Sequence, residues 1–207
     1  MLRIWGRANS SNVRKVLWCA EELGLHYTRI DAGGAFGVVD TPGYRAMNPN
    51  GRVPVIDDDG FVLWESNAIV RYLAARHGGD GNWMPRDLQC RARAEQWMDW
   101  TTSTFAPVFR DLFWGVLRTP QAQRDASRIE AARVACAQQL ALVDAALADA
   151  PYLAGHTPSV GDIALGSFAY AWFEMPIERP AQPHLLAWYR RLRARPAYQR
   201  GVMTELT

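Results

Sequence analysis

Apolar positions near the N-terminus predict two strands with a helix between them. Leu2–Trp5 and Tyr27–Ile30 are short segments that predict strands, and Gly24 marks the end of the helix that precedes the second segment. The apolar side chains of this helix recur at helical spacing on one face, at Val13, Val16, Leu17, Ala20 and Leu23. The order strand–helix–strand predicts a parallel crossover unit.

A hairpin is predicted further along the chain. Residues 32–49 contain many Gly and Pro residues and predict a loop with at most one short helical turn. Val53, Val55 and Phe61–Trp64 are apolar strand formers, and Asp58–Gly60 between them are turn formers. Pro54 cannot donate a hydrogen bond to a sheet, so it belongs at the start or edge of its strand.

A helix follows the hairpin and continues to Ala75, with Ser66 as its expected N-cap. The backbone beside Val53 and Pro54 is then free to pair with a ligand. A peptide lying there would meet the N-terminus of this helix, which favours a carboxylate. The sequence therefore predicts a binding site for a small acidic peptide.

The pattern changes completely after residues 79–86, which are dense in helix breakers and predict a linker. Arg86–Leu117 is helical, with Pro107 expected to bend or split it. Further helices are expected over Gln121–Ala150, Pro183–Arg195 and Pro196–Met203. The sequence thus predicts an α+β protein of two domains, residues 1–78 and an all-helical domain of residues 87–207.

Ser159–Asp162 has the pattern of a capping box, with Asp162 in the place of the usual Glu or Gln. An acidic residue on a largely apolar helix invites a catalytic interpretation. Capping explains Asp162 better, so we expect it to support folding and to take no part in chemistry.

Composition excludes several classes of function. The net charge of +2 argues against a nucleic-acid-binding protein, which depends on many phosphate contacts. No N-terminal signal peptide and no apolar run long enough to span a membrane is visible, so we expect no membrane partner. The four His residues show no ligand-like pairing, so we expect no metal. The nine Trp residues suggest an aromatic-lined interior or pocket.

The cysteines are odd in number and widely spaced, at positions 19, 90 and 136. This pattern suits reduced thiols in the cytoplasm better than a disulfide framework or a metal site. We expect each of the three to fill the core of a helix.

The two segments Asn50–Ile56 and Leu63–Leu73 together resemble the glutathione-binding core of the cytosolic glutathione transferases, in both order and spacing. The resemblance extends over nearly the whole chain and is greatest to the bacterial branch. It implies a thioredoxin-like first domain, built as βαβ followed by ββα. It also implies a cis proline at Pro54, pairing of the Val53 backbone with the cysteine of glutathione, and binding of the γ-glutamyl end by Glu65 and Ser66.

A transferase of this family must stabilise the thiolate of glutathione with a donor in the turn before the first helix. That turn contains Asn9, Ser10, Ser11 and Asn12. When the turn is aligned on Val16, it resembles the turn of the serine-type classes. This resemblance makes Ser10 the first candidate for the donor to the thiolate and Asn12 the second, while Ser11 and Asn9 also remain candidates. The turn contains no Tyr, which argues against the tyrosine-type classes, and no Cys, which makes thiol transfer by the protein itself improbable.

The resemblance implies further binding residues and partners. Arg52 is expected near the glycine carboxylate of glutathione. The electrophile pocket is expected to be lined by residues of both domains, namely Trp5, Arg7, Phe105, Phe109 and Trp114. A homodimer is also expected.

The sequence therefore predicts a glutathione transferase that conjugates glutathione, its co-substrate, to a small electrophile, with halide displacement from an activated carbon as one form of this chemistry. A glutathione-binding module without activity is the main alternative, because a fold does not establish chemistry. A glutathione-dependent peroxidase, disulfide reductase or isomerase on the same site is a further alternative.

Overall fold

The structure is a computed structural model that describes residues 1–79 and 83–207. The chain forms two compact units. Unit 1 comprises Met1–Met84 together with Ala194–Glu205, and unit 2 comprises Pro85–Arg193 with Leu206–Thr207. Residues 80–82 of the predicted linker lie outside the described residues.

Unit 1 contains a four-stranded sheet with the strand order β2-β1-β3-β4. Its strands are β1 (Leu2–Trp5), β2 (Tyr27–Ile30), β3 (Val55–Asp58) and β4 (Phe61–Trp64). The central strand β1 pairs in parallel with β2 and antiparallel with β3, which forms the predicted hairpin with β4. Both the parallel crossover and the hairpin predicted from the sequence are therefore confirmed.

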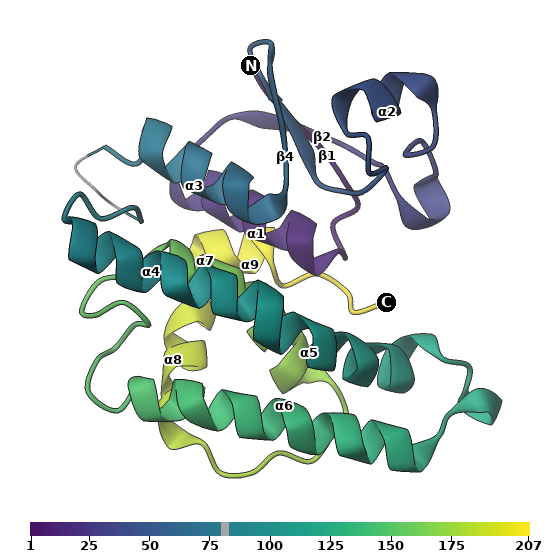
Figure 1. The fold of residues 1–207 in the computed structure, drawn as a ribbon, viewed down its shortest axis with the longest axis vertical. Helices are drawn as coiled ribbons and strands as arrows, with labels where there is room; N and C mark the ends of the chain where they lie inside the picture. Colours follow the sequence, from purple (N-terminus) through teal and green to yellow (C-terminus); the bar gives the residue numbers. More distant parts are fainter. Residues whose placement is uncertain (80–82) are drawn as a thin grey trace. The chain divides into compact units, whose positions relative to one another are not determined.

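The helices of unit 1 complete the thioredoxin-like arrangement predicted above (Figure 1). Helices α1 (Ser11–Glu22) and α3 (Ser66–His77) pack against each other. A short helical turn at Gly34–Phe36 and helix α2 (Pro42–Met47) occupy the region predicted as a loop. Thr41 explains this second helix, because its hydroxyl accepts a hydrogen bond from Tyr44 N and Pro42 follows at the first helical position.

Helix α9 (Pro196–Gly201) belongs to unit 1, whereas the sequence prediction placed all residues after 87 in the helical domain. It packs on α1, with the rings of Trp18 and Tyr198 edge to face at 4.8 Å between centroids. Glu22 of α1 also pairs with Arg195, with Nε and Oε1 2.6 Å apart. The apolar pattern of a short helix shows that it must be buried but does not show against which partner.

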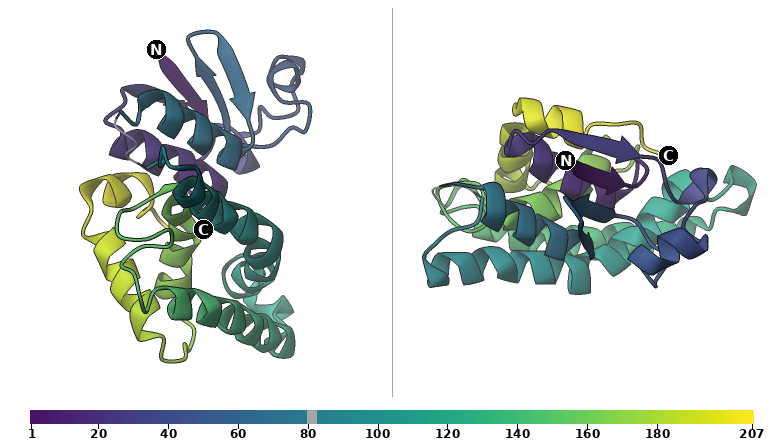
Figure 2. Two further views of the ribbon diagram at one scale, coloured as in Figure 1. Left: turned by 60° about the vertical axis from the view of Figure 1, so that its left-hand side comes forward. Right: turned by 90° about the horizontal axis from the view of Figure 1, so that it is seen from above.

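The secondary-structure elements of unit 2 within its described residues are all helices, joined by loops (Figure 2). Its first long segment comprises α4 (Leu88–Trp100), a π-helical turn (Thr101–Phe105), α5 (Ala106–Phe113) and a second π-helical turn (Trp114–Arg118). The interruption falls just before Pro107, as expected from the missing N–H of proline. The remaining helices are a 3₁₀ turn (Gln121–Gln123), α6 (Ala126–Ala146), α7 (Val160–Glu174) and α8 (Pro183–Arg193). The helix predicted over Gln121–Ala150 is thus shorter than expected, because Asp125 caps its start with bonds from the amides of Ser127 and Arg128.

The capping box of α7 is confirmed. Asp162 is fully buried and accepts hydrogen bonds from Ser159 N at 2.8 Å, Leu153 N at 3.0 Å and Trp188 Nε1 at 2.8 Å. Burial raises the pKa of this carboxyl, while its hydrogen bonds act in the opposite direction. Asp162 therefore connects the start of α7 with Leu153 and with Trp188 of α8 inside unit 2.

Candidate functional site

A pocket of about 500 Å³ in unit 1 collects most of the predicted site residues. The segments that reach it are the turn before α1, the loop before β3 and the start of α3. The predicted residues that line it are Arg7, Ser10, Asn12, Arg52, Val53, Pro54, Glu65 and Ser66. Residues from three separate stretches of sequence thus share one cavity.

The loop before β3 is held by two buried side chains. Tyr44 Oη and Asn48 Nδ2 each donate to the carbonyl oxygen of Arg52, both at 2.8 Å. Burial raises the pKa of Tyr44 to about 12, so its hydroxyl stays protonated and can donate. The peptide bond between Val53 and Pro54 is cis, as the resemblance implied. The backbone of Val53 is therefore fixed at the wall of the pocket.

The start of α3 differs in one respect from the prediction. Glu65, and not Ser66, is the N-cap residue, and its backbone φ of 73° lies in the left-handed region. Its carbonyl accepts the first helical bond from Ile69 N at 2.9 Å. Ser66 is therefore the first residue of the helix, and both residues line the pocket.

A polar network lies beneath this wall of the pocket. Ser66 Oγ donates to Asn12 Oδ1 at 3.3 Å, and Lys15 Nζ donates to Ser66 Oγ at 3.5 Å and to Asn67 Oδ1 at 3.2 Å. Lys15 is only 2% exposed. Burial lowers its pKa to about 8, while the nearby charge of Glu65 raises it. The network connects α1 with the start of α3.

The turn before α1 divides the four candidate donors. Ser10 and Asn12 line the pocket, whereas Asn9 and Ser11 are not among its lining residues. Ser10 is the backbone N-cap of α1, yet its side chain makes no capping hydrogen bond. Its hydroxyl is thus available beside a helix N-terminus, where partial positive charge favours an anion.

Five lining residues were not identified from the sequence: Gly33, Gly34, Val39, Asn48 and Gly51. The glycines allow close approach of neighbouring chains. A Cβ on Gly33, whose φ is 78°, would lie 3.2 Å from Val53 Cγ1 and from Arg7 Nη1. In the sequence, only the Gly33–Gly34 pair indicated a close approach of neighbouring chain segments. The pair does not indicate which side chains pack against it.

The predicted electrophile-binding residues do not share this pocket, except for Arg7. Trp5 packs on the buried cluster of Ala32, Tyr44 and Val55. In unit 2, Phe105 and Phe109 are 0% and 2% exposed and pack on each other and on Phe168. Their role toward an electrophile therefore stays a prediction.

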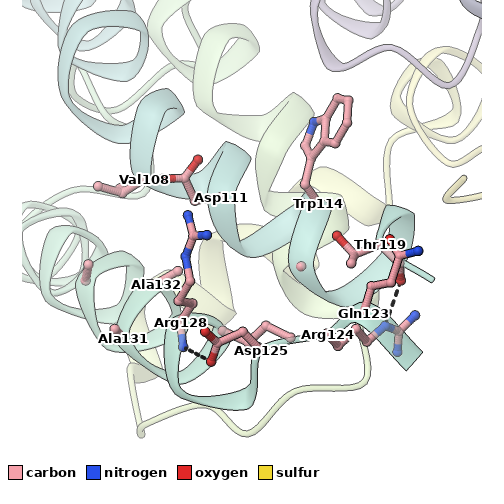
Figure 3. A pocket seen from close by; sticks show the side chains of 13 residues that line it. Val108, Asp111, Trp114, Thr119, Gln123, Arg124, Asp125, Arg128, Ala131 and Ala132 are labelled. Atoms are coloured by element: carbon pink, nitrogen blue, oxygen red, sulfur yellow. Dashed lines mark hydrogen bonds between the residues drawn. The ribbon is translucent and has the colours of Figure 1, made fainter. Parts of the chain in front are cut away.

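Trp114 lies at a second pocket of about 500 Å³, on the surface between α5 and α6 of unit 2 (Figure 3). Its side chain is 52% exposed and lies beneath the guanidinium of Arg118. Asp111, on the preceding helical turn, and Arg128, on α6, line the same pocket.

Two of the cysteines fit the prediction of buried helix positions, and one does not. Cys19 and Cys136 are buried, and burial raises the pKa of both thiols, that of Cys136 to about 12. Cys90 is exposed, because it lies in the first turn of α4 on a polar face.

Metal-binding clusters and membrane-spanning helices are both absent from the part of the chain that the structure describes. Within residues 1–79 and 83–207, no group of three or more His, Cys, Asp or Glu side chains is arranged to hold a metal ion. In the same part of the chain, none of the helices combines the length and hydropathy needed to cross a bilayer.

Two family models match the chain. Residues 9–76 match the glutathione S-transferase N-terminal domain, and residues 105–196 match the glutathione S-transferase C-terminal domain. Both matches follow the division into an α+β part and a helical part.

Individual proteins are similar over the full length. The chain is 44% identical to the glutathione S-transferase GstB of Escherichia coli K12, over 98% of each chain. It is 30% identical to glutathione S-transferase 3 of Zea mays, over 97% of this chain and 93% of the other. Among solved structures, the theta class glutathione S-transferase of Xanthomonas axonopodis pv. citri with glutathione bound is 66% identical, with a TM-score of 0.96 over 100% and 99% of the two chains.

Proposed function

The chain belongs to the glutathione S-transferase family and is a glutathione transferase, and we propose that the pocket of unit 1 binds glutathione and activates its thiol. The observation that supports this most is the convergence of Ser10, Val53–Pro54 and Glu65–Ser66 on one cavity. The solved structure that is 66% identical contains bound glutathione, which further supports glutathione as the co-substrate here.

Glutathione lies with its cysteine beside the backbone of Val53, which the cis proline and the held carbonyl of Arg52 present to the pocket. Its γ-glutamyl end binds at Glu65 and Ser66, where the N-terminus of α3 attracts the carboxylate and the carboxylate of Glu65 attracts the ammonium group. Arg52, exposed at the rim, pairs with the glycine carboxylate.

Ser10 donates a hydrogen bond to the glutathione sulfur and so stabilises the thiolate, the form that attacks an electrophile. Its half-buried hydroxyl lines the pocket at the N-terminus of α1 and is not used for capping. Asn12 is the second candidate, because its amide oxygen accepts from Ser66 and its amide nitrogen can donate. This choice assigns the chain to the serine-type branch of the family.

Retention on immobilised glutathione tests the binding site. We expect Pro54→Ala and Glu65→Gln to abolish or strongly reduce retention, because the first alters the loop that presents Val53 and the second removes the charge at the γ-glutamyl end. Glu130→Gln is the matched control, because Glu130 pairs with Arg133 on the exposed surface of α6 and is not among the residues that line this pocket. Normal retention of both site variants would overturn the assignment.

The ultraviolet absorbance of bound thiolate, titrated against pH, tests the activating residue. We expect wild-type protein to show the thiolate band below the pKa of free glutathione and Ser10→Ala to lose it, with Asn12→Ala close to wild type. Loss of the band in Asn12→Ala alone would transfer the role to Asn12. Glutathione binding without a thiolate band in wild type would contradict the proposal of a pre-formed thiolate.

The electrophile is a separate question. Halide displacement from an activated carbon stays a prediction, and release of free halide from a panel of alkyl and aryl halides tests it. Product analysis of the same reactions separates conjugation from peroxidase or disulfide reductase activity, because only conjugation yields a thioether.

A homodimer and a cytoplasmic location also stay predictions.

A further inference from the structure

Arg14 connects the C-terminal segment of the chain to the turn that carries Ser10. It lies on α1 and is 0% exposed. Its Nε donates to the carbonyl oxygen of Ala8 at 3.2 Å and to Thr204 Oγ1 at 3.1 Å. Its Nη2 donates to Thr204 Oγ1 at 2.8 Å, to Thr204 O at 3.1 Å and to Glu205 O at 3.0 Å. One guanidinium thus contacts both segments at once.

Thr204 bridges the Arg14 side chain and the carbonyl oxygen of Ala8. Its hydroxyl accepts from Arg14 and donates to the carbonyl oxygen of Ala8 at 3.3 Å. Ala8 therefore receives two donors, two residues before Ser10. The backbone of Arg14 also donates to the carbonyl oxygen of Ser10 at 2.9 Å. This last bond is the first backbone bond of α1 and does not depend on the Arg14 side chain, which reaches the turn through the carbonyl oxygen of Ala8.

The C-terminal segment is itself fixed to α1. Helix α9 approaches so closely that a Cβ on Gly201 would lie 2.6 Å from the backbone nitrogen of Trp18. Val202, which follows, is fully buried. The close packing of Gly201 and Val202 thus places Thr204 beside the turn.

We propose that Arg14 and Thr204 are positioning residues for the thiolate, forming a clamp between the C-terminal segment and the Ala8–Ser10 turn. This inference rests on the proposed role of Ser10. A hydroxyl stabilises an anion only when it is held within hydrogen-bond distance, so a small displacement of the turn weakens activation. The contacts of the clamp described above are with Ala8, Thr204 and Glu205, and Val53, Glu65 and Ser66 are not among them, so we expect the clamp to affect the thiolate more than the affinity for glutathione.

Thr204→Val and Thr204→Ser form the matched test pair. Valine keeps the shape and removes the hydroxyl, whereas serine retains it. We expect Thr204→Val to raise the pKa of bound glutathione thiol by about half a unit to one unit, which is about a three- to tenfold change in thiolate at a given pH. The kcat should fall with it, while KM for glutathione changes less than about twofold. Thr204→Ser should stay close to wild type.

Amide hydrogen exchange of residues 7–12 gives a second measurement that is independent of activity. We expect faster exchange there in Thr204→Val than in Thr204→Ser, with unchanged exchange in β3 and β4. Arg14→Lys should show the same change, because one ammonium group cannot reproduce the planar fork of donors.

The outcomes separate the two proposals. If Ser10→Ala loses the thiolate band while Thr204→Val keeps the wild-type titration, kcat and hydrogen exchange, the clamp is overturned and the role of Ser10 stands. If Ser10→Ala keeps the band, the proposed function of Ser10 fails. Faster exchange in Thr204→Val would then still support a clamp on the turn, but its role in positioning the thiolate would be overturned.

Discussion

At the scale of single residues, Lys15 is a buried charged residue that contacts Ser66, which lines the pocket of unit 1. It is the only lysine in the chain, and its ammonium group lies beneath Ser66 and Asn67. Burial of a charge is costly unless it is hydrogen-bonded and compensated. Glu65 supplies the opposite charge. Arg14 precedes Lys15 on α1, and Glu21 and Glu22 lie further along the helix, where they pair with Arg200 and Arg195.

The lowered pKa of Lys15 predicts a pH-dependent contribution to stability. The ordinary value of 10.5 falls to about 8 in the folded protein. Between these values the unfolded chain binds the proton and the folded chain does not, so stability rises with pH in this window. Relative to Lys15→Met, we expect the free energy of unfolding of wild type to increase by about 3 kcal/mol from pH 8 to pH 10.5. Urea denaturation across this range measures it, and a difference that does not change with pH would contradict the assigned pKa.

At the scale of elements, α1 is central to unit 1. It is buried along nearly its whole length, since it contacts α3 and α9 and presents its N-terminus to the pocket. The contact with α9 depends on a glycine, because Gly201 lies directly on the backbone of α1. Backbone atoms cannot turn aside as a flexible side chain can, so this contact tolerates no Cβ.

We therefore expect Gly201→Ala to destabilise the protein by about 1–3 kcal/mol. Its Cβ would come within 2.6 Å of two backbone atoms of Trp18. Gly43→Ala is the matched control, because Gly43 also lies in a short helix but has nothing within 4 Å of the added Cβ. The control should be neutral or stabilising by less than about 1 kcal/mol. Equal urea midpoints for the two variants would show that α9 does not pack in this way.

At the scale of the whole molecule, the chain consists of two units with separate features. The residues proposed to bind glutathione lie in unit 1, whereas unit 2 has its own core around Phe105, Phe109 and Phe168. Ligand binding to one unit stabilises the folded chain through mass action. The expected homodimer would add a dependence on protein concentration.

Two measurements test these expectations at this scale. Light scattering should give about twice the chain mass of 23.3 kDa. A mass near 23.3 kDa at micromolar concentration would contradict the homodimer.

Glutathione at about 100 times its dissociation constant should add about 2.7 kcal/mol to the free energy of unfolding. This gain should disappear in Glu65→Gln, because that variant loses binding.

The sequence by itself determined the number and order of the strands, most helices and most of the residues that line the pocket of unit 1, although β3 extends from Val55 to Asp58 and so includes a residue predicted in the turn. These follow from local rules: apolar spacing, turn formers, capping residues and a pair of motifs with fixed spacing. Pro54 and Ser10, which line this pocket, could be selected as candidates because each is recognised from its immediate neighbours in the chain. The capping box at Asp162 was predicted for the same reason.

Only the tertiary structure decided which distant segments meet. It joined α9 to the first unit, placed Thr204 against Ala8, and put Lys15 beneath Ser66. It also showed that Glu65 takes the N-cap position and that Cys90 is exposed. The physical reason is that burial and hydrogen bonding depend on packing between elements, and an apolar face or a buried cation can be satisfied by many partners that sequence spacing does not distinguish.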